Sequence, residues 1–166
     1  MKFSRQIRYY YLRFIRLRGE PHELALGLAL GVFTGMMPIM PFQTALGVTL
    51  ALFFRGSKIT AALGTWVSNP LNWYFIYHYS YKLGTAILGL KEQSAAYTAI
   101  MRGIRSGGEF VAIAGKALEA GSTFVAAFLV GGVVLGTAFA VPSYFVSLRL
   151  FRSIRDWRES RKRHRL

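Results

Sequence analysis

Residues 24–54 read LALGLALGVFTGMMPIMPFQTALGVTLALFF, an unbroken run without a charged residue or a histidine. A run of this length and composition is typical of a segment that lies in lipid. Pro38 and Pro41 interrupt it near the middle, where they remove backbone donors and disfavour one straight helix. As helices, residues 24–37 and 42–54 would each reach only about 20 Å, against a hydrocarbon core of about 30 Å. The sequence therefore predicts a re-entrant hairpin or a broken helix here.

The net charge of +14 in this 166-residue chain comes almost entirely from its two ends. Basic residues dominate residues 1–18 and 149–166, whereas the apolar middle is nearly neutral. Basic segments that flank apolar spans are the usual mark of the cytoplasmic side of a membrane. Both ends are therefore expected in the cytoplasm, with anionic lipid headgroups as partners and no specific nucleic acid. Cysteine is absent, which excludes disulfides and thiol chemistry.

The apolar and charged segments together predict an all-α integral membrane protein of the bacterial inner membrane, with two full crossings. Its expected parts are a basic amphipathic interfacial helix at 1–20, a membrane domain at 21–148 and a basic cytoplasmic helical tail at 149–166. The membrane domain is expected to contain a re-entrant segment at 24–54, a broken helix at 58–90, an external amphipathic loop at 91–119 and a transmembrane helix at 120–148. Within the broken helix, Asn69 is expected to cap a helix that begins at Pro70.

Two breaks, at residues 37–44 and 65–72, carry the most informative polar residues. Backbone that is irregular at membrane depth survives only where it is buried in protein or lines a polar cavity, and half-helix N-termini attract anions. The breaks therefore predict either a ligand site or a compact fold in which the breaks satisfy each other. The candidate ligand-binding residues are Gln43, Thr44, Ser68, Asn69 and Asn72, and the helix-breaking residues are Pro38, Pro41 and Pro70.

Glycines recur at four-residue spacing in two of the apolar runs, which places small residues on one helix face. Such stripes let helices approach closely within lipid, either inside one chain or between the copies of a homo-oligomer. The two stripes are expected to face each other. They consist of Gly27, Gly31 and Gly35 in the first run and of Gly132 and Gly136 in the last.

Catalytic chemistry finds little support in this sequence. The three histidines show no metal-ligand spacing, and neither a phosphate-binding loop nor a nucleophile elbow is present. We expect no catalytic residue, no metal and no cofactor. His22 and Glu23 precede the first apolar run, where Glu23 suits the positive end of a helix and either residue could carry protons.

Three strings of the sequence resemble the domain-of-unknown-function 2062 family. They are PHELALGLALGVF at 21–33, FQT at 42–44 after Pro38, and GTWVSNPL at 64–71. The resemblance spans about residues 10–148 and implies a small bacterial membrane protein, in a family whose domain is sometimes fused to a family-2 glycosyltransferase. It carries over no catalytic residue. Asn72 and Trp73 stand where members often have Thr and further prolines, which leaves the shape of the second break open.

The two function hypotheses differ in what the membrane domain does. In the first, the paired breaks form a polar intramembrane pocket that binds or moves an anionic amphiphile of the lipid-phosphate class. In the alternative, the chain is a non-catalytic membrane module whose basic ends dock a cytoplasmic enzyme such as a glycosyltransferase.

Overall fold

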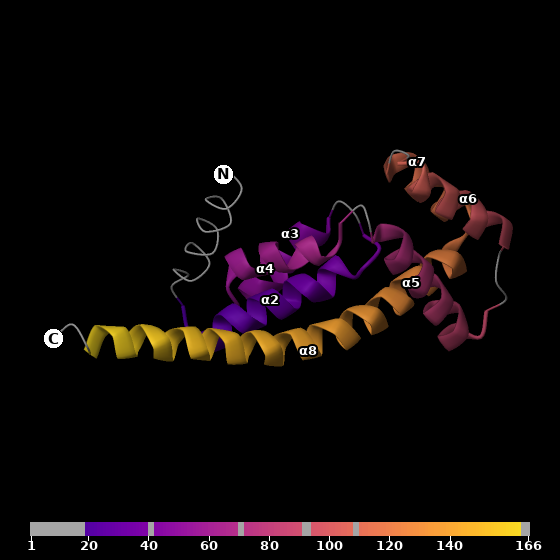
Figure 1. The fold of residues 1–166 in the computed structure, drawn as a ribbon. Coiled ribbons are helices and arrows are strands. Elements are labelled where there is room, and N and C mark those ends of the chain that lie inside the picture. The colour runs from indigo at the N-terminus through magenta and orange to yellow at the C-terminus, as the bar shows by residue number, and fades with distance from the viewer. Residues whose placement is uncertain (1–18, 40–41, 70–71, 91–93, 108–109, 164–166) are drawn as a thin grey trace.

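The computed structural model describes residues 19–39, 42–69, 72–90, 94–107 and 110–163, and Figure 1 shows their arrangement. These residues form helices joined by turns, so the expected all-α class is confirmed for this part of the chain. The interfacial helix expected at 1–20 lies almost wholly outside it. The helices, in order, are α2 (Pro21–Gly35), α3 (Gln43–Phe53), α4 (Lys58–Gly64), the 3-10 helix η1 (Thr65–Val67), α5 (Trp73–Leu88), α6 (Ser94–Arg105), α7 (Phe110–Glu119) and α8 (Ser122–Arg163).

Helix α8 contacts α2, α5 and α7, whereas α3 and α4 pack on α2, and α6 packs on α5 and α7. Figure 1 shows α2, α3 and α4 over the middle of α8, and α5, α6 and α7 around its N-terminal end. It runs without a break through Pro142 and into the basic tail, so the expected boundary at residue 148 falls inside one continuous helix. The run without charged residues ends at Leu148, and the helix continues from there into the basic tail.

Among the described helices, α8 alone is long and apolar enough to cross a membrane. Helix α5, which the sequence suggests as a second crossing, has 16 residues and is therefore about 24 Å long. Two crossings and cytoplasmic ends thus stay predictions.

The first apolar run folds as a helical hairpin. Pro21 occupies the first turn of α2, where a missing N–H costs nothing, and the helix ends at Gly35 before a bend at Met37 and Pro38. Helix α3 then returns along α2. Ser57 is the N-cap residue of α4, and its side chain accepts a hydrogen bond from the backbone N–H of Thr60. Helix α4 packs against both α2 and α3.

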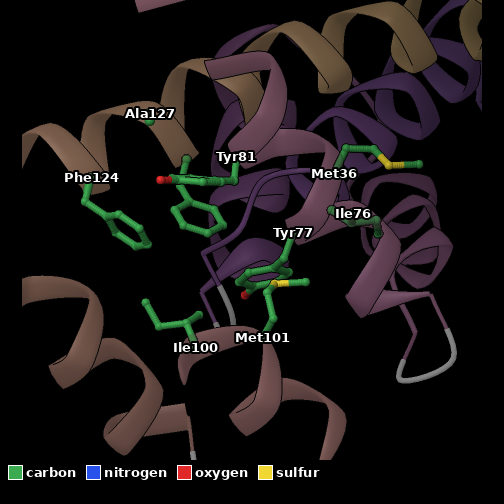
Figure 2. Close-up of a cluster of buried hydrophobic side chains, with 9 residues drawn as sticks. Met36, Ile76, Tyr77, Tyr81, Ile100, Met101, Phe124 and Ala127 are labelled. Atoms are coloured by element: carbon green, nitrogen blue, oxygen red, sulfur yellow. The ribbon is translucent and has the colours of Figure 1, made fainter. Parts of the chain in front are cut away.

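A cluster of aromatic and aliphatic side chains forms a second core at the other end. Figure 2 shows Tyr77 and Tyr81 of α5 with Ile100 and Met101 of α6 directed toward them. The ring centroids of Tyr81 and Phe124, on α8, are 4.9 Å apart, a distance at which aromatic pairs attract beyond their burial. The stretch expected as an external loop at 91–119 therefore contains two helices, α6 and α7, that pack onto this core.

Candidate functional site

The two helix breaks lie against each other and are joined by a hydrogen bond between two threonines. The Oγ1 atoms of Thr44, in the first turn of α3, and Thr65, in η1, are 3.1 Å apart. Thr65 donates its own hydroxyl to the carbonyl oxygen of Ala62 at 2.8 Å, so Thr44 is the donor to Thr65. The end of α2 meets the same point, since a Cβ added to Gly35 would lie 3.2 Å from the Thr65 Cα. The breaks are therefore one structural unit.

Asn72 closes the second break with both ends of its side-chain amide. Its Oδ1 accepts from the backbone N–H of Asn69 at 2.9 Å, and its Nδ2 donates to the carbonyl oxygen of Val67 at 2.5 Å. Helix α5 begins at Trp73 with Asn72 as its N-cap residue, so the prediction that Asn69 is the cap is wrong. The reason is a tight turn, in which the Asn72 and Trp73 N–H groups both donate to the Asn69 carbonyl oxygen. Pro70 lies outside the described residues.

Gln43 and Ser68 lie at the same two breaks and are half-buried. Gln43 is the first residue of α3, whose N-cap residue, Phe42, has no side chain able to accept a first-turn N–H. Ser68 directly follows η1 and donates its backbone N–H to the carbonyl oxygen of Thr65 at 3.1 Å. The five predicted polar residues are thus gathered around one junction, although Pro41, beside Phe42, is outside the described chain.

The space beside the first break is apolar. A cavity of about 280 Å³ has Pro38, Ile39 and Phe42 as one wall, and α5, α6, α7 and α8 as the others. None of the five polar residues lines it. The hydroxyl of Thr44 instead joins the two breaks and the amide of Asn72 closes the second, while the adjoining volume suits hydrocarbon.

His22 and Glu23 lie at the opposite end of α2 from the breaks, about 22 Å away along the helix. Both are exposed, and Glu23 is in the first turn, where its charge is favoured by the helix dipole. The Nδ1 atom of His22 is 2.8 Å from the hydroxyl of Tyr144 on α8. An exposed ion pair at 3.3 Å, between Glu20 and Arg155, joins the same two helices. The structure therefore does not bring these residues to the breaks.

The two glycine stripes pack on different partners. A Cβ on Gly27 or Gly31 would overlap the backbone of α4, whereas Gly132 lies against Pro38 and Gly136 against the carbonyl oxygen of Phe33. The expectation that the stripes face each other is wrong, because α4 occupies the face of α2 that carries the first stripe.

Two further glycines that the sequence analysis missed join α5 to α8. A Cβ on Gly84 would overlap the carbonyl oxygen of Ala127, and a Cβ on Gly131 would overlap that of Ser80. The signal that could have found them is the four-residue spacing of small residues, Ser80 with Gly84 and Ala127 with Gly131.

A second missed contact attaches α6 to α5. The Nδ1 atom of His78 is hydrogen-bonded to the hydroxyl of Tyr97, and the Tyr97 ring stacks on Tyr81 with centroids 4.8 Å apart.

Within the described ranges, no three His, Cys, Asp or Glu side chains are grouped so as to hold a metal ion.

Comparison with known proteins identifies the family and little else. The family model described as "Uncharacterized protein conserved in bacteria (DUF2062)" matches residues 4–160, so the chain belongs to this family. No curated protein and no solved structure matches the chain.

Proposed function

We propose that this member of the uncharacterised bacterial family is an inner-membrane protein that binds or moves an anionic amphiphile of the lipid-phosphate class at its joined helix breaks. The observation that supports the proposal best is the contact between the first break and the apolar part of α8. Pro38 lies against Gly132, where an added Cβ would be 2.6 Å from the proline Cδ. Gly132 is about 15 Å along α8 from Ser122, which is half the thickness of a hydrocarbon core of about 30 Å. With Ser122 at the edge of the core, the first break would lie near the midplane.

The helix lengths support a topology with one re-entrant hairpin. With 15 and 11 residues, α2 and α3 reach about 22 and 16 Å, so neither spans alone. In the proposed arrangement α5 crosses outward, its shortfall of about 6 Å accommodated by local thinning of the bilayer, and α6 and α7 lie outside. Helix α8 then returns to the cytoplasm, where its basic end attracts anionic lipid.

The chemistry of the junction suits a phosphate group. The first turn of α3 points its backbone N–H groups and the positive end of its dipole toward the first break. Half-helix N-termini near the bilayer midplane bind anions in other membrane proteins. Gln43 and Asn69, at the two breaks, would add orienting hydrogen bonds.

A binding measurement in lipid nanodiscs tests this proposal. A polyprenyl phosphate is expected to bind at least about tenfold more tightly than the polyprenol of the same chain length, equivalent to about 1.4 kcal/mol. Gln43→Ala and Asn69→Ala should each remove most of that difference. The matched control is Thr49→Ala, which removes a hydroxyl bonded to Ala45 within α3. Equal affinity for phosphate and alcohol, or indifference to both alanine variants, would count decisively against the proposal.

A further inference from the structure

We infer that the cavity beside the first break is a binding site for a single hydrocarbon chain of a membrane lipid, with the α6–α7 hairpin as its cover. The inference takes the membrane setting from the proposed function but assigns a different group to a different place: the chain of the lipid, not its phosphate.

The walls of the cavity select hydrocarbon. Its volume is about 280 Å³, and no charged side chain lines it. A dry apolar cavity of about 150 Å³ already accepts benzene-sized guests, so this volume can hold a stretch of alkyl or isoprenoid chain. A phosphate or sugar would meet no charged group there and would leave its polar atoms unpaired, which is costly.

The cavity is continuous with the surface that faces lipid in the proposed topology. Phe42, beside the first break, lines it, yet 67% of Phe42 is exposed. Leu129, in the apolar part of α8, also lines the cavity and is exposed. Because the occupant must come from the medium at this opening, the bilayer supplies a lipid chain at high local concentration.

The α6–α7 hairpin closes the side of the cavity opposite α8. Ile100 comes from α6 and Ala117 from α7, and Figure 2 shows Ile100 directed toward the cluster that contains Tyr77 and Phe124. The hairpin is attached through side chains, including the hydrogen bond between His78 and Tyr97.

Glycines with positive φ stand at both ends of the two helices. They are Gly89 at φ 63°, Gly107 at φ 69° and Gly121 at φ 100°. Glycine adopts such backbone conformations without strain. The turns that bound the hairpin therefore need no side-chain contacts to stabilise them. A cover held by side chains and bounded by glycine turns fits a chain-binding cavity.

Photolabelling tests the inference with a probe that has no phosphate. A long-chain alcohol with a diazirine at mid-chain is added to the full-length protein in phosphatidylcholine nanodiscs, and mass spectrometry maps the label after illumination. The label is expected to concentrate on residues 113–118 and 125–129, at least about fivefold above Val134, which is exposed on α8 near the proposed midplane. Even labelling of the two parts of α8 would overturn the inference.

Cavity-filling variants sharpen the same experiment. Ala117→Phe should lower the labelling of residues 125–129 about tenfold, because its ring occupies the volume. Ala112→Phe, on the exposed side of α7, should leave it unchanged. Ala114→Leu makes the same test with a smaller side chain if Ala117→Phe fails to fold. Unchanged labelling in a folded cavity-filling variant would also overturn the inference, whereas a failure of phosphate binding would not affect this result.

Discussion

The two groups of helices that lie along α8 are packed differently. In the group over the middle of α8, α2 meets α4 through glycines, so that Gly31 approaches the Ala61 carbonyl and Gly64 approaches Leu28. At the N-terminal end, α6 and α7 are held by large side chains around Tyr81 and Phe124. The first region, the glycine-packed bundle (α2, α3 and α4), therefore brings backbone to backbone. In the second, the aromatic cluster (Figure 2), side chains attach α6 and α7, although α5 and α8 within it meet backbone to backbone at Gly84 and Gly131.

This difference indicates which region can change shape. Where glycines bring two helix backbones into contact, there is no room for added side-chain volume. Glycine also has no side chain that could change its rotamer. A cluster of flexible and aromatic side chains can repack, and interiors tolerate volume-conserving changes best. The apolar cavity and its α6–α7 cover lie on the side-chain-packed end, which agrees with a binding role there.

The largest expected effect is in the aromatic cluster. Phe124 is 2% exposed and touches both Tyr81 and Phe128, so Phe124→Ala should lower the free energy of unfolding by about 3–5 kcal/mol. The control Phe145→Ala removes a ring that is 59% exposed on the same helix, and should cost about 0.5 kcal/mol or less. Titration with denaturing detergent in mixed micelles measures both. Equal losses would show that the cluster is not a core.

The next effect is in the glycine-packed bundle. Gly31→Ala places a Cβ against the backbone of Ala61, so α2 and α4 must separate, at an expected cost of about 1–3 kcal/mol. Gly115→Ala in α7 is the matched control, because a Cβ there meets nothing within 4 Å and alanine favours the helix by up to about 1 kcal/mol. The same unfolding titration compares them. A stabilising Gly31→Ala would contradict the close approach of these helices.

The smallest effect concerns the junction that separates the two regions. A double-mutant cycle with Thr44→Val and Thr65→Val should give a coupling energy of about 0.6–1 kcal/mol for their hydrogen bond. The control cycle pairs Thr49→Val with Thr65→Val, since the Thr49 hydroxyl bonds only within α3 at Ala45, and should give no coupling. Coupling within error of zero for the first pair would mean that the breaks are not joined in solution.

Local features of the chain predicted much of the helical framework. Proline positions placed the first break, because a proline inside a helix has no N–H to donate, and charge patterning marked the long apolar stretch that became α8. The start of α5 was predicted wrongly at Pro70, because the sequence pattern of a cap cannot show that Asn72 would bridge Asn69 and Val67 with its amide. Such bridging depends on how the turn places the Asn69 N–H and the Val67 carbonyl.

By itself, the sequence determined the helical class, the place of the first break and the apolar and basic ends of α8, because each depends on residues that are neighbours along the chain. Only the tertiary structure decided which glycine stripe meets which helix, that Thr44 meets Thr65 and that the space beside the first break is apolar. The physical reason is that spacing on one helix names a face but not the partner of that face. Partners are chosen by the packing of all helices at once, and here α4 took the face of α2 that α8 was expected to cover.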